Sequence, residues 1–85
     1  MNTPEKLRVK AGLSMTQLAD RAGVSKTTVS NLERGETVRL RGVTLEKIGK
    51  ALRDRMAERN QKLTIDEFID AVFALRDAKL RGKAA

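Results

Sequence analysis

The sequence predicts an all-α domain of five helices. Residues that cap helices stand at the start of the apolar stretches, glycines follow several of these stretches, and no stretch alternates apolar and polar side chains as a strand would. The chain has 85 residues, room for a single domain whose small core would gain from a partner subunit. We expect residues 1–60 to form the core of the domain and residues 61–85 to add a C-terminal helix continuous with it.

The first helix is defined by the residues at its two ends. Thr3 and Pro4 have the form of an N-cap followed by a proline at the first helical position, where the missing N–H has no helical partner to lose. Ala11 and Gly12 supply a stop. A short helix is therefore expected over residues 4–10.

Two further short helices follow, joined by a tight turn. Ser14 and Gln17 have the form of a capping box at the start of one helix, which ends at Gly23 because glycine accepts a left-handed backbone. Ser25 can cap the next helix, which ends at Gly35. Two short helices joined by so short a turn cannot lie antiparallel and must cross at a steep angle. This is the shape of a helix-turn-helix.

Two longer helices complete the chain. A loop over residues 36–43 is followed by a fourth helix, which Thr44 is expected to cap and residues 60–62 to end. Its apolar positions are Leu45, Ile48, Leu52 and Met56. A second capping box, residues 64–67, opens the last helix, which is expected to fray over residues 82–85. The apolar face of this helix comprises Ile65, Phe68, Ile69, Val72, Phe73 and Leu80.

The chain is strongly basic, and the excess is uneven. Lys and Arg number 18 against 11 Asp and Glu, a formal charge of +7 that favours a nucleic acid or an anionic membrane surface as partner. Residues 1–35 hold six basic and three acidic side chains, residues 36–62 eight and four, and residues 63–85 four and four. The surface for a polyanion is therefore expected on the first two thirds of the chain.

Composition also argues against enzymes and metal sites. The chain has no cysteine and no histidine, so disulfides and the usual zinc ligands are excluded, and no cofactor is expected. Asp66, Glu67 and Asp70 cluster on one helix, but alternating charge on a solvated face explains them, so catalysis has almost no support. The N-terminus lacks the apolar core of a signal peptide, and no stretch approaches the roughly 20 apolar residues that span a bilayer. We expect a cytoplasmic, nucleoid-associated protein rather than a membrane protein.

The segment from Gly12 to Gly35 resembles the helix-turn-helix of phage repressor and Cro-type regulators, the xenobiotic-response-element family. The positions that fit are Leu13, Leu18, Ala19, Gly23, Val24, Val29, Leu32, Glu33 and Gly35. A similar helical layout extends from about Glu5 to Asp54. The resemblance implies a lambda-repressor-like fold and a transcriptional regulator that binds double-stranded DNA in a sequence-specific manner. A homodimeric repressor on a palindromic operator is the expected form.

The resemblance also implies which side chains read bases. The first residues of the third helix project into the major groove, which points to Lys26, Thr27, Ser30 and Asn31. Their chemistry agrees, since lysine donates to guanine, asparagine pairs with adenine in two-pronged fashion, and threonine contacts a base edge or the thymine methyl. The alternative is that these polar residues form an ordinary solvated face.

Phosphate contacts are expected around this helix, because backbone charge supplies affinity and fixes register. The candidates are Thr16, Gln17, Thr28, Arg34, Arg39 and Arg41. In the related repressors the loop that holds the last two lies along the DNA backbone, so Arg41 is a candidate to sense minor-groove width; a solvated basic loop is the alternative. The family usually has glutamine where this chain has Met15, which cannot contact phosphate or brace the third helix, so Lys26 is less constrained and can itself reach phosphate.

Two structural expectations remain. Arg8 and Glu33 occupy positions that form an ion pair between the first and third helices in the resemblance. The C-terminal helix is expected to supply a homodimer interface, because a two-fold pair of helix-turn-helix units doubles the contact with DNA. The interface residues would be Ile65, Phe68, Ile69, Val72 and Phe73. The alternative for this stripe is the core of the monomer.

A second class of function also fits the sequence. An antitoxin would cover a toxin with its terminal helix while its helix-turn-helix binds its own promoter, and a neighbouring cotranscribed toxin gene would indicate this role. RNA polymerase is the other protein partner that the resemblance allows.

Overall fold

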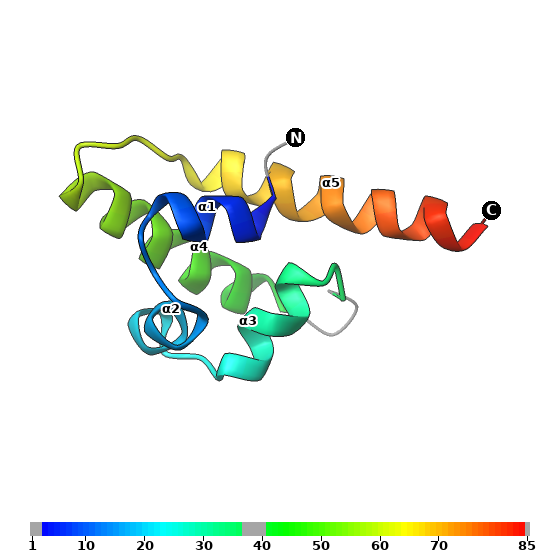
Figure 1. The fold of residues 1–85 in the computed structure, drawn as a ribbon, viewed down its shortest axis with the longest axis horizontal. Helices are drawn as coiled ribbons and strands as arrows, with labels where there is room; N and C mark the ends of the chain where they lie inside the picture. Colours follow the sequence, from blue (N-terminus) through cyan, green and yellow to red (C-terminus); the bar gives the residue numbers. More distant parts are fainter. Residues whose placement is uncertain (1–2, 37–40, 85) are drawn as a thin grey trace.

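The computed structural model describes residues 3–36 and 41–84, and this part of the chain contains five helices and no strand. The helices are α1 (Pro4–Lys10), α2 (Met15–Ala22), α3 (Lys26–Glu33), α4 (Gly42–Glu58) and α5 (Ile65–Ala84). Figure 1 shows α2 and α3 on one side of α4, with α1 and α5 on the other. The predicted all-α fold of five helices is confirmed.

The first three helices begin where their capping residues predict. Thr3 and Ser25 each accept a hydrogen bond from the amide N–H three residues later, at 3.2 and 3.1 Å. Ser14 and Gln17 form both bonds of a capping box, at 3.1 and 2.9 Å. Each bond pairs an amide that has no partner inside its helix, so the local sequence defines these ends.

The boundaries of the two longer helices differ from the prediction. Helix α4 begins at Gly42, and its N-cap position is Arg41, so Thr44 lies inside the first turn and does not cap the helix. Arg41, Gly42 and Val43 are all exposed, so water can satisfy the first amides without a side-chain cap. Helix α5 continues to Ala84 instead of fraying from Gly82, because good helix formers flank that single glycine.

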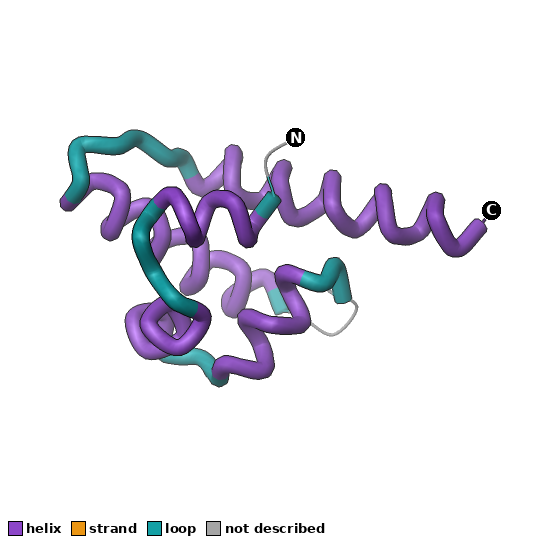
Figure 2. Tube along the Cα trace, in the orientation of Figure 1, coloured by secondary structure: helices purple, strands orange, loops and turns teal. Residues whose placement is uncertain are grey.

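All five helices contribute side chains to the core, and Figure 2 shows how these helices are arranged. Its largest fully buried side chains are Phe68, Leu18, Leu32, Ile48, Leu52, Met56, Val29, Val72 and Pro4. Helices α4 and α5 approach closely at Gly49, where an added Cβ would lie 3.0 Å from Cδ2 of Phe68. A side chain at this crossing would press on the phenyl ring, which would have to shift by a few tenths of an ångström.

This packing corrects part of the expected dimer interface. Phe68 and Val72 are 0% exposed within the single chain, so they belong to the monomer core and offer no surface to a second copy. Ile65 and Ile69 are partly buried, and Ile69 packs against the core. Phe73 is 46% exposed. Helix α5 therefore has a core face and a separate exposed apolar face.

The C-terminal half of α5 projects beyond the other helices in Figure 1, and the domain measures 41 × 24 × 20 Å. Along its length α5 crosses the end of α3 at Gly35, whose φ of +78° favours glycine. An added Cβ there would lie 3.2 Å from Cδ of Lys79 and 3.4 Å from Cγ of Leu75.

Among the described residues, no helix combines the length and the apolar character that a membrane span requires.

Candidate nucleic-acid interface

Helices α2 and α3 are joined by a turn that fixes their crossing. Gly23 takes the left-handed conformation, with φ 70° and ψ 35°. The N–H of Val24 donates to the carbonyl oxygen of Ala19 at 3.0 Å, which closes the end of α2. Ser25 then caps α3, so the connection between the two helices is too short for α3 to fold back along α2. The steep crossing expected of a helix-turn-helix follows from this geometry.

One face of α3 is held firmly against the rest of the domain. Val29 is 0% exposed and Leu32 is 1% exposed. The expected ion pair between Arg8 and Glu33 is present, with Nε to Oε2 at 2.7 Å and Nη2 to Oε1 at 3.0 Å. A third donor, Nη1, bonds the carbonyl oxygen of Leu13 at 2.9 Å. The forked pair locks α3 onto α1 in a single orientation.

Burial makes this pair a structural one. The side chains of Arg8 and Glu33 are only 12% and 4% exposed. The hydrogen bond that Arg8 donates to Glu33 raises the pKa of the Arg8 guanidinium above its ordinary value, while burial acts in the opposite direction. The two side chains are therefore paired with each other and directed inward, away from the polar face of α3.

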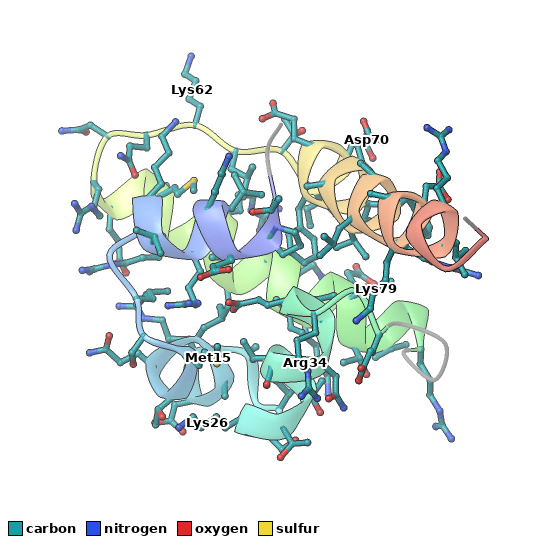
Figure 3. The ribbon with its side chains drawn as sticks, turned by 45° about the vertical axis from the view of Figure 1, so that its right-hand side comes forward. Met15, Lys26, Arg34, Lys62, Asp70 and Lys79 are labelled. Carbon is teal, nitrogen blue, oxygen red and sulfur yellow. The ribbon has the colours of Figure 1, made fainter. Side chains whose placement is uncertain are left out.

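The opposite face of α3 is open. Lys26 and Thr27 are exposed, and Ser30 and Asn31 are partly exposed. In Figure 3, Lys26 lies at the free N-terminal end of α3, on the side of the domain opposite Lys62 and Asp70. These four positions repeat at i and i+4, so they share one surface of the helix. The structure thus brings all the proposed base-reading residues together.

Three of the proposed phosphate contacts already have partners, and one of these is Gln17, whose Oε1 accepts from the N–H of Ser14 at 2.9 Å. The Thr28 hydroxyl lies 2.8 Å from the Ser25 hydroxyl and shares a hydrogen bond with it. Arg34 donates from Nη2 to Oδ1 of Asn31 at 2.5 Å and lies 3.4 Å from Oε2 of Glu36. To contact phosphate, Arg34 would have to share or leave these partners.

Thr16, Gln17 and Arg41 lie at helix starts. Thr16 and Gln17 are exposed at the N-terminal turn of α2, where amides and the helix dipole favour an anion. Met15, the first residue of α2, is partly buried and packs against the core, so its thioether offers no donor to DNA. Arg41 is exposed directly before α4. The remaining candidate, Arg39, lies outside the described residues.

Two of the arginines expected on the basic surface, Arg21 and Arg55, connect helices. Arg21 and Arg55 both bond Glu58 at 3.2 Å, and Nε of Arg55 donates to the carbonyl oxygen of Ala11 at 3.1 Å. The hydrogen bonds from Arg21 and then from Arg55 lower the pKa of the Glu58 carboxyl below its usual range. This exposed cluster ties α2 to α4, so part of the positive charge of residues 36–62 is matched within the domain.

Two residues near α3 were not predicted from the sequence. Lys79 of α5 donates from Nζ to the carbonyl oxygen of Arg34 at 2.6 Å, and Figure 3 shows the two residues in neighbouring positions. Its Nζ also lies 3.7 Å from Oε1 of Glu36. Lys79 and Arg34 are 45 residues apart in the chain, so no local pattern indicates this contact.

Comparison with known proteins agrees with this geometry. The family described as Helix-turn-helix (HTH_3) matches residues 5–53, more than half of the chain. No curated protein and no solved structure matches the sequence.

Within the described residues, no three His, Cys, Asp or Glu side chains gather in a group that could hold a metal ion.

Proposed function

We propose that this chain, which belongs to the Cro/C1-type helix-turn-helix family of DNA-binding transcriptional regulators, is a homodimeric repressor that reads a palindromic operator in the major groove. The observation that carries the proposal is the division of α3 into two faces. Val29, Leu32 and Glu33 fix one face to the domain, while Lys26 and Thr27 stand exposed on the other. A rigid helix with an exposed polar face at its N-terminal end is what entry into the major groove requires.

The roles of the individual side chains follow from their chemistry. Lys26 donates to O6 or N7 of guanine, Asn31 pairs with adenine, and Thr27 contacts a base edge or a thymine methyl. Thr16, Gln17 and Arg41 contact phosphates on either side, which fixes the register of α3 on the duplex. The net charge of +7 adds affinity that does not depend on sequence.

The exposed face of α5 supports the homodimer. Ile65, Ile69, Phe73 and Leu80 recur at helical spacing, and the last two are 46% and 53% exposed. Residues 65–72 hold three acidic and no basic side chains, whereas residues 73–81 hold three basic and one acidic. Two copies of α5 packed antiparallel would therefore set unlike charges against each other. The two-fold axis would place the recognition helices about 34–36 Å apart, one turn of DNA.

The base-reading role predicts a loss that depends on sequence. Thr27→Ala or Asn31→Ala should weaken binding to the preferred duplex by about 1–3 kcal/mol and leave binding to a random duplex nearly unchanged. Fluorescence anisotropy titrations of both duplexes at one salt concentration measure the two effects.

Arg41→Ala is the matched control for a backbone contact. It should weaken binding to both duplexes alike and reduce the salt slope by about one unit. If Thr27→Ala and Asn31→Ala also lower both affinities equally, the base-reading role is wrong. An unchanged salt slope in Arg41→Ala would instead show that Arg41 is a solvated side chain that makes no phosphate contact.

If α5 forms the dimer interface, a substitution on its exposed face should prevent dimerisation without unfolding the monomer. Phe73→Asp places a charge in the exposed apolar face, so the variant should keep its helical signal, sediment as a monomer and lose cooperative occupancy of a two-half-site duplex. Ala78→Asp adds the same charge at another exposed position of α5, about 140° around the helix, and should remain dimeric. A Phe73→Asp protein that stays dimeric would place the interface elsewhere.

The same exposed side chains also favour a second candidate. As an antitoxin, the chain would cover a toxin with Phe73 and Leu80 and use α3 to regulate its own promoter. Sedimentation of the unmodified chain as a monomer, together with a cotranscribed neighbouring gene whose product it binds, would support this function over the homodimer.

A further inference from the structure

We propose that Lys79 of α5 is a positioning residue for base recognition, which holds Asn31 in its reading geometry through Glu36 and Arg34. The inference rests on the proposed function, since it concerns how α3 reads DNA. Its basis is a continuous set of contacts from α5 to the outer face of α3.

The first contact lies at the C-terminal end of α3. Arg34 is the C-cap residue of this helix, and its carbonyl oxygen accepts the 2.6 Å hydrogen bond from Nζ of Lys79. Carbonyls at a helix end lack partners within the helix, and a cation there also complements the negative end of the helix dipole. Lys79 therefore fixes the backbone from which the Arg34 side chain projects.

The approach of Lys79 is directed by packing. Its methylene Cδ lies 3.2 Å from where a Cβ on Gly35 would be, so its stem runs against the backbone of the turn. The side chain is only 36% exposed. The methylene groups of Lys79 are thus packed against the turn, whereas a fully solvated lysine samples many rotamers.

Glu36 and Arg34 then extend the contact to Asn31. One carboxylate oxygen of Glu36 faces Lys79 at 3.7 Å, and the other faces Nη2 of Arg34 at 3.4 Å. The same Nη2 donates to Oδ1 of Asn31 at 2.5 Å. A basic, an acidic and a second basic side chain thereby alternate from α5 to the base-reading amide.

This hydrogen bond suits the chemistry of adenine recognition. Asn31 must accept from the adenine N6 amino group and donate to N7. Its Oδ1 has two lone pairs, so one can remain with Arg34 while the other faces the base, and the amide NH2 is left to donate. Because the amide is already oriented, less rotamer freedom is lost on binding.

The test compares Lys79→Met with Arg81→Met, a substitution with the same charge change at an exposed position of α5. Lys79→Met keeps an apolar stem against Gly35 and removes only the ammonium. We expect its preference for adenine over other bases at the position read by Asn31 to fall by about three- to tenfold. Its unfolding temperature and its Kd for a random duplex should match those of Arg81→Met.

Three further variants define the role. Lys79→Arg should restore the preference for adenine, because a guanidinium can make the same two contacts. Glu36→Gln should reproduce the loss of preference, since it weakens both ion pairs while leaving the core untouched. In an Asn31→Ala background, Lys79→Met should cause no further loss of base preference.

The outcomes separate this inference from the proposed function. If Lys79→Met and Glu36→Gln retain the preference for adenine, the positioning role is overturned while selective binding by the unmodified protein still supports the proposed function. Equal weakening on preferred and random duplexes, with a smaller salt slope, would make Lys79 a direct phosphate contact and also overturn it. If the unmodified protein shows no preference among duplexes, the proposed function itself fails.

Discussion

Phe68→Ala is expected to destabilise the domain by about 3–5 kcal/mol, because it empties a ring-sized volume that α5 inserts against α4. Phe68 is 0% exposed, and its ring lies in close contact with Gly49. A domain of this size has a total stability of only about 5–10 kcal/mol, so the substitution should remove a large share of it. Urea unfolding followed by circular dichroism measures the loss.

Phe73→Ala is the matched control, since it makes the same chemical change on the same helix at a 46% exposed position. Its free energy of unfolding, measured per monomer at low protein concentration, should fall by less than about 1 kcal/mol. Equal losses in the two variants would show that α5 is not divided into a core face and an exposed face.

Arg8→Met is expected to cost about 3–5 kcal/mol, because it leaves the carboxylate of Glu33 charged, buried and without its partner. Glu33 is 4% exposed and accepts two hydrogen bonds from Arg8. The variant also removes the donor to the carbonyl oxygen of Leu13. Thermal and urea unfolding at neutral pH measure the change in stability.

Arg21→Met provides the comparison for an exposed pair, because its partner Glu58 has a half-exposed side chain. Its cost should be much smaller than that of Arg8→Met, because solvent screens an exposed ion pair. The double variant Arg8→Met/Glu33→Met should recover much of the stability that Arg8→Met loses, since no buried charge remains. If Arg8→Met costs no more than Arg21→Met, the pair does not hold α3 in place.

The local features of the fold could be predicted because they depend on neighbouring residues. Thr3, Ser14 and Ser25 each bond an amide three residues away, so their positions alone define the helix starts. The same reasoning was wrong at Thr44, because two exposed residues before it can enter the helix without any side-chain cap. A capping residue permits a helix start but does not require one.

The division of α5 could not be predicted from its periodicity. Helical spacing identifies Phe68 and Phe73 as apolar positions, but it does not say whether α4 or a second molecule covers each one. Lys79 and Glu36 escaped prediction for a related reason. Their contacts with α3 depend on where α5 crosses Gly35, which is a property of the tertiary packing and has no local signature.

Selection of bound sequences from a pool of random DNA duplexes tests whether α3 reads bases from a two-fold dimer. We expect enrichment of an inverted repeat whose half-sites lie about one helical turn apart, since two recognition helices would read it. The Asn31→Ala protein should select the same repeat but show no base preference at one position of each half-site. Recovery of a pool without enrichment, or of an unchanged motif by Asn31→Ala, would contradict a base-reading role for α3.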